Sequence, residues 1–209
     1  MAEVREGCAL LIEKVRRHIG DAALLAAGGR LEGASLFVLL GFEESGKLLY
    51  LLQSAAEAEA AGADRVTLEA FADHTGKAAV TSEYISRVID LILWASRQAG
   101  VADESLGGYL DHLTAVGKGF MDLRARAMFI DYVNGTWTRG RAVSLEFLQG
   151  DSLCLAFLTS SVEEALGKYS SFRDLVASFK SLDQELRKNL PRLFQEIIRI
   201  SSSQSATPQ

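Results

Sequence analysis

One group of charged residues interrupts a stretch of the chain that is otherwise apolar. Glu43, Glu44 and Lys47 lie in the middle of residues 36–52, and five apolar residues stand at each end of that range. Residues three and four apart share a helix face, so the ammonium group of Lys47 can reach either carboxylate. Since a lone ion costs several kcal/mol to bury, these groups must be paired, solvated in a cleft or used in function.

A second pair of residues that could transfer protons and carry charge follows on the next helical segment. His74 and Lys77 are three residues apart, and each lysine of the two segments follows a glycine, Gly46 or Gly76. A glycine lets another backbone approach closely, so we predict that the two helices cross there. The predicted cluster consists of Glu43, Glu44, Lys47, His74 and Lys77. Ion pairs and a histidine that only stabilise the bundle remain the alternative.

Long helices are expected to position these residues. The chain has two prolines in 209 residues, and neither comes before position 191. Apolar residues recur at helical spacing over five segments and a C-terminal region, at about 2–28, 30–62, 67–99, 109–132, 144–169 and 170–200. The periodicity predicts an all-α bundle of five to seven helices with residues 36–52 at its centre and no sheet. Ser144 is expected to cap the fifth helix, and Gly62 to end the second.

Composition excludes several classes of protein. A formal net charge of −5 argues against a broadly basic nucleic-acid binder, and no DNA partner is expected. Charges in the middle of the central helix argue against a membrane span. Cys8 and Cys154 fit no metal-ligand spacing and are typical of buried thiols in a cytoplasmic protein. Lys47 and Lys77 stand where a di-metal helical bundle needs anionic or neutral ligands, so neither a metal nor another cofactor is expected.

Three motifs in order resemble those of one known family. They consist of Glu43, Glu44, Gly46 and Lys47; then Phe71, His74 and Lys77; then Phe129, Asp131 and Tyr132. Over about residues 5–170 this order is similar to that of the abortive-infection AbiV family, a branch of the HEPN superfamily. The resemblance implies an α-helical HEPN-like bundle. We expect a single helical HEPN/AbiV-like domain over residues 1–200 and a disordered tail over 201–209.

The resemblance also implies a function, which would be phage defence in the bacterial cytoplasm by binding or cleaving RNA or the translation machinery. Many HEPN domains are metal-independent endoribonucleases with an Arg-x4–6-His motif at a dimer interface. Here Arg126 is followed five residues later by Asp131, so this motif is incomplete. Both residues are weaker candidates for the site.

Two functions therefore stay open. In a ribonuclease, His74 would be the general base or acid, and Lys47, Lys77 or Arg126 would stabilise negative charge on the phosphate. In a non-catalytic HEPN-type interaction module, the same residues would only shape the bundle. The expected partners are a second copy of the chain, an RNA or ribonucleoprotein target, and a phage or antitoxin protein. The predicted dimer interface on the fifth helix consists of Leu148, Leu153, Phe157 and Leu158.

Overall fold

The computed structural model describes residues 1–181 except 99–103, 129–130, 134–135, 139–142 and 180. Its elements are α1 (Ala2–Ala27), α2 (Leu31–Ala61), the 3-10 helix η1 (Glu69–Ala72), α3 (His74–Gln98), α4 (Glu104–Met128), β1 (Asp131–Val133), β2 (Thr136–Thr138) and α5 (Leu145–Lys168). Residues 172–179 are also helical. The all-α fold with five to seven helices is therefore confirmed. The predicted tail at 201–209 and the predicted helix beyond 181 lie outside the described residues.

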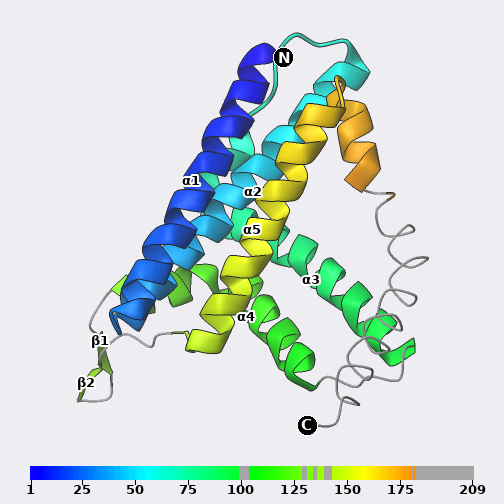
Figure 1. The fold of residues 1–209 in the computed structure, drawn as a ribbon. Coiled ribbons are helices and arrows are strands. Elements are labelled where there is room, and N and C mark those ends of the chain that lie inside the picture. The colour runs from blue at the N-terminus through cyan, green and yellow to red at the C-terminus, as the bar shows by residue number, and fades with distance from the viewer. Residues whose placement is uncertain (99–103, 129–130, 134–135, 139–142, 180, 182–209) are drawn as a thin grey trace.

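Helix α2 is the centre of the bundle, as its apolar composition predicted. It contacts α1, α3, α4 and α5, and in Figure 1 it lies between the layer of α1 and α5 and the pair formed by α3 and α4. Two hydrophobic clusters pack on it, one around Phe42 and the other around Leu48 and Leu52. Gly62 ends the helix in the left-handed conformation, with φ of 65°, as expected.

The third predicted segment is divided into two elements. A helix was expected from residue 67, but η1 ends at Ala72 and α3 begins at His74. The reason is a cap, because the Asp73 carboxylate accepts a hydrogen bond of 2.9 Å from the backbone N–H of Gly76. A side chain on Gly76 would meet this carboxylate. The prediction that Gly76 allows α2 to approach is therefore wrong.

The prediction that the chain contains no sheet is also wrong. The fourth helix was expected to reach residue 132, but α4 ends at Met128 and an antiparallel pair of short strands follows. In this pair Asp131 lies opposite Thr138, and Tyr132 opposite Trp137. The sequence has Asn-Gly between aromatic and β-branched residues, which favours a hairpin over a helix.

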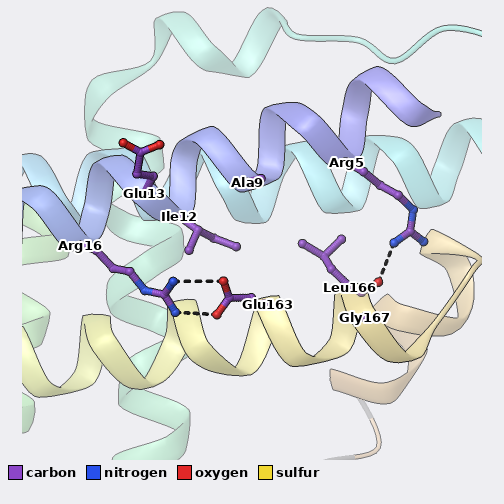
Figure 2. A pocket seen from close by; sticks show the side chains of 8 residues that line it. All are labelled: Arg5, Ala9, Ile12, Glu13, Arg16, Glu163, Leu166 and Gly167. Carbon is purple, nitrogen blue, oxygen red and sulfur yellow. Dashed lines mark hydrogen bonds and ion pairs between the residues drawn. The ribbon is translucent and has the colours of Figure 1, made fainter.

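Helices α1 and α5 pack side by side and are joined at their surface by charged contacts. Arg16 and Glu163 form two hydrogen bonds, of 3.0 and 2.6 Å, and Arg5 donates to the carbonyl of Leu166 at 2.7 Å (Figure 2). These residues line a shallow cleft of about 410 Å³. Ser144 caps α5 through the N–H of Phe147, as predicted.

Burial differs between the two cysteines and along the predicted interface stripe. Cys8 is fully buried, as expected, whereas Cys154 is only partly buried, and both are free thiols. In the predicted stripe, Leu148 and Leu158 are 3% and 0% exposed and belong to the core.

Among the helices that the structure describes, none has both the length and the apolar character needed to cross a membrane.

Candidate functional site

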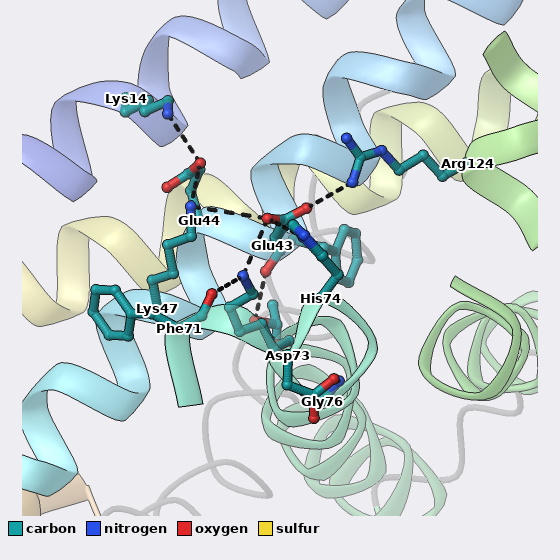
Figure 3. Close-up of polar contacts among 12 residues, drawn as sticks. Lys14, Glu43, Glu44, Lys47, Phe71, Asp73, His74, Gly76 and Arg124 are labelled. Atoms are coloured by element: carbon teal, nitrogen blue, oxygen red, sulfur yellow. Dashed lines mark hydrogen bonds and ion pairs between the residues drawn. The ribbon is translucent and has the colours of Figure 1, made fainter. Parts of the chain in front are cut away.

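The carboxylate of Glu43 lies at the centre of the charged cluster. Its Oε1 atom is 2.7 Å from Nδ1 of His74 and 3.2 Å from Nζ of Lys77. Its Oε2 atom is 3.2 Å from Nη1 of Arg124, and Lys47 lies 3.8 Å from Oε1. Figure 3 shows Lys47, His74 and Arg124 directed toward Glu43; these three side chains come from α2, α3 and α4. The Glu43 side chain is only 5% exposed, and a buried charge needs partners. Its four cationic or hydrogen-bonding neighbours meet this need.

The neighbouring carboxylate, Glu44, binds two lysines, one of which it shares with Glu43. Nζ of Lys47 is 2.9 Å from its Oε1 atom, and Nζ of Lys14 on α1 is 3.0 Å from the same atom. Lys47 therefore bridges the two glutamates. The structure thus brings together all five residues of the predicted cluster, on two crossing helices.

The crossing of α2 and α3 depends on Gly46, as the sequence suggested. A side chain on Gly46 would run into the backbone of Lys77. One turn further along α3, Oγ1 of the buried Thr81 donates to the carbonyl of Phe42 at 2.9 Å. The two backbones are therefore in direct contact, which brings the start of α3 beside the charged turn of α2.

The exposure of the cluster divides its residues into two groups. Of the five residues of the predicted cluster, His74 is the most exposed, with 48% of its side chain accessible, and Lys47 follows with 20%. Of the cations that the structure adds, Lys14 is 53% exposed and Arg124 26%. Lys77 is only 1% exposed, and its ammonium group also donates to the carbonyl of Phe71. A ligand at the surface can thus reach His74, Lys47 and Arg124, whereas Lys77 lies beneath them.

Both glutamates are held in their charged form. Burial alone would raise the pKa of Glu43, but hydrogen bonds from His74 and Lys77 outweigh it, and the pKa lies below its ordinary value of 4.5. Burial is likewise outweighed at Glu44 by Lys47 and Lys14, and its pKa is also lowered from 4.5. The charged carboxylates are therefore stabilised by folding.

These lowered pKa values predict how stability depends on pH. Each carboxylate binds a proton more readily in the unfolded chain, so its contribution is complete above pH 4.5 and is lost as the pH falls through the lower folded-state pKa. We expect the free energy of unfolding, measured with urea, to decrease below pH 4.5, and to decrease less in Glu43→Gln and Glu44→Gln. An equally steep decrease in both variants would contradict the lowered pKa values.

Sequence reasoning missed two members of the cluster, Lys14 and Arg124. Lys14 lies on α1 and Arg124 on α4, and no spacing rule tells which residues of these helices face the central motif. Arg126 and Asp131, the weaker predicted candidates, belong to α4 and β1. Their side chains lie outside the described residues, so Arg124 is the arginine that the structure places in the cluster.

A second polar network, also not predicted, ties α4 to α5. The carboxylate of Asp151 is 2.8 Å from Nε2 of His112 and accepts a hydrogen bond of 2.7 Å from the hydroxyl of Tyr109. The ring of His112 stacks on Phe147 with 4.5 Å between centroids. Burial raises the pKa of Tyr109, and the nearby Asp151 raises it further. Because His112 and Asp151 are 9% and 2% exposed, this network is typical of a structural tie.

The described residues contain no group of three His, Cys, Asp or Glu side chains that could hold a metal ion. The two glutamates of the cluster bind lysine, histidine and arginine groups instead.

Comparison with known proteins identifies a family. The family model of AbiV, a HEPN family, matches residues 3–157. No curated protein and no solved structure matches the chain. The matched range includes α1 to α4 and thus every described residue of the Glu43 cluster. With three quarters of its length matched, the chain belongs to the AbiV family of HEPN proteins.

Proposed function

We propose that this protein is a phage-defence effector of the AbiV type that acts in the bacterial cytoplasm and cleaves RNA at the Glu43 cluster. Membership of the family supports the abortive-infection role. The proposal of RNA cleavage rests on one observation, the contact of 2.7 Å between Nδ1 of His74 and the carboxylate of Glu43.

This contact assigns the proton on the imidazole ring. An ionised carboxylate can only accept hydrogen bonds, so Nδ1 of His74 must be the donor. In the neutral ring Nε2 then carries a lone pair, and no residue that the structure describes engages this atom. A half-exposed histidine held in this way by a buried carboxylate can accept a proton from a substrate hydroxyl.

The charge around the site favours an anionic substrate. Four cations are bonded to the carboxylates of Glu43 and Glu44, namely Lys14, Lys47, Lys77 and Arg124. Within this group the cations therefore outnumber the carboxylates by two. Arg124 donates to Glu43 from Nη1, and a guanidinium group has further N–H donors that would bind phosphate oxygens. The partly exposed cations Lys47 and Arg124 flank the carboxylate that orients His74.

RNA fits this arrangement because it carries its nucleophile beside its phosphate. Nε2 of His74 would take the proton of a 2′-hydroxyl, and the 2′-oxygen would form a bond to phosphorus. The bond from phosphorus to the 5′-oxygen would break, and this oxygen would take a proton from water. Lys47 and Arg124 would stabilise the negative charge that develops on the phosphate. Because the 2′-oxygen is the nucleophile, the products would be a 2′,3′-cyclic phosphate and a 5′-hydroxyl end.

The alternative function, a non-catalytic HEPN-type interaction module, is favoured by a different observation. Most charges of the cluster are bonded to one another, and Glu43, Glu44 and Lys77 are almost inaccessible. The Arg-x4–6-His motif is incomplete as well. In that case the cluster would shape a surface that binds a phage or antitoxin protein or a ribonucleoprotein.

Incubation of the purified protein with total RNA distinguishes the two functions. We expect cleavage by the wild type and a rate about 10²–10⁴-fold lower for His74→Gln, the range typical of a lost general base. Equal cleavage by both proteins would remove His74 from the mechanism. No cleavage by the wild type, with binding of a protein partner, would favour the interaction module.

A homodimer remains a proposal, and the structure changes which residues could form it. Of the predicted stripe, Leu153 and Phe157 are 71% and 51% exposed and one turn apart on α5. Exposed apolar pairs of this kind are suited to an interface. We expect light scattering to give the mass of a dimer for the wild type and that of a monomer for Phe157→Glu. A monomeric wild type at micromolar concentration would contradict the dimer.

A further inference from the structure

Lys77 is a buried cation at the base of the site. Its residue exposure is 0%, and it is among the largest fully buried side chains of the described chain. Its ammonium group has two acceptors, Oε1 of Glu43 at 3.2 Å and the backbone carbonyl of Phe71. A buried lysine of this kind cannot contact a substrate at the surface, so its role must be exerted through these two neighbours.

These two acceptors belong to the segments that place His74. Glu43 lies on α2, Phe71 lies on η1 immediately before the start of α3, and Lys77 itself is in the first turn of α3. Nζ of Lys77 and Nδ1 of His74 donate to the same oxygen of Glu43. The ammonium group of Lys77 thus links the carboxylate that orients the imidazole to η1, which precedes His74, and to the first turn of α3, which follows it.

We propose that Lys77 is a positioning residue for His74. It holds the Glu43 carboxylate and the end of η1 in place, so that the imidazole keeps its proton on Nδ1 and leaves Nε2 unengaged. This inference rests on the proposed role of His74, but it concerns the tautomer of the ring and can be tested without RNA. Without Lys77, the Glu43 carboxylate and the Phe71 carbonyl lose the ammonium group that joins them, so both can move. The contact between Glu43 and Nδ1 of His74, which fixes the tautomer, is then no longer held in place.

The test is a two-bond ¹H–¹⁵N correlation spectrum of the histidine rings, which distinguishes the two neutral tautomers. In the wild type, recorded at a pH where the imidazole is neutral, we expect the His74 signals of a ring protonated only at Nδ1. In Lys77→Met, we expect averaged ¹⁵N shifts that report a mixture of both tautomers. Unchanged His74 shifts in a folded Lys77→Met protein would overturn the proposal.

Thr81→Val is the matched control. Thr81 is as buried as Lys77 and also joins α3 to α2, because its hydroxyl donates to the carbonyls of Phe42 and Lys77, but it forms no hydrogen bond with the Glu43 carboxylate. The variant should lower the melting temperature and leave the His74 spectrum unchanged. A tautomer mixture in Thr81→Val as well would show that any loosening of the crossing has this effect, and would overturn a specific role for Lys77.

A measurement on the wild type keeps the proposal testable if Lys77→Met does not fold. The ammonium protons of Lys77 should exchange slowly with water and show a nuclear Overhauser effect to the His74 ring, whereas those of the exposed Lys168 should exchange too fast to be seen. Equally fast exchange at both lysines would overturn the proposal. If RNA is not cleaved but the spectra agree with expectation, the proposed ribonuclease activity fails and the positioning role of Lys77 stands.

Discussion

Gly46→Ala is expected to destabilise the protein by about 3 kcal/mol, at the upper end of the usual cost of overpacking. A Cβ atom at this position would lie 2.6 Å from Cα and 2.5 Å from the carbonyl carbon of Lys77. Both are backbone atoms of a buried helix turn, so no side-chain rotation can relieve the contact. The variant can fold only if α2 and α3 move apart, and that movement would also weaken the contact between Glu43 and His74.

Thermal unfolding measures this effect against a control within the same chain. For a domain of this size each kcal/mol corresponds to roughly 2–4 °C, so the melting temperature of Gly46→Ala should fall by roughly 6–12 °C. Gly20 lies inside α1, and a methyl group added there would meet no neighbouring side chain or helix within 4 Å. Gly20→Ala should therefore raise stability by about 0.5–1 kcal/mol. A Gly46→Ala protein as stable as the wild type would show that the helices do not cross at this glycine.

His74→Gln is expected to abolish growth arrest during phage infection and to change stability little. Loss of a general acid or base typically lowers a rate by about 10²–10⁴-fold, which is enough to remove a defence that depends on turnover. Glutamine can still donate a hydrogen bond to Glu43. Since 48% of the His74 side chain is exposed, we expect a stability change of only about 1 kcal/mol or less.

His112→Gln is the matched control for this prediction. His112, on α4, is also bonded to a carboxylate, that of Asp151 on α5, but its side chain is only 9% exposed. This network is separate from the Glu43 cluster. Its replacement should lower the melting temperature and preserve growth arrest as long as the protein remains folded. Loss of arrest in both variants in proportion to lost stability would contradict a specific role for His74.

The sequence predicted much of the site because its charges lay where a helix is otherwise apolar. Burial makes unpaired ions costly, so Glu43 and Glu44 had to find partners, and the glycine at position 46 indicated where a second helix could approach. These two constraints were enough to bring His74 and Lys77 to the correct place. The structure has the same contacts, at 2.7 and 3.2 Å from Glu43.

Other features could not be predicted from local patterns. Lys14 and Arg124 join the cluster through the packing of α1 and α4 on α2, which no sequence spacing encodes. Gly76 resembled Gly46, but the cap by Asp73 gives it a different role. The apolar stripe of α5 did not show which of its leucines face the core, because a helix that is apolar over a wide arc can bury either side.

Efficiency of phage plating, measured beside melting temperature for His74→Gln, tests the central claim that the Glu43 cluster is a functional site. We expect cells with the variant to lose protection while the purified protein melts within roughly 4 °C of the wild type, which corresponds to the small stability change expected at an exposed position. Full protection by His74→Gln, or loss of protection only together with a large loss of stability, would contradict the claim.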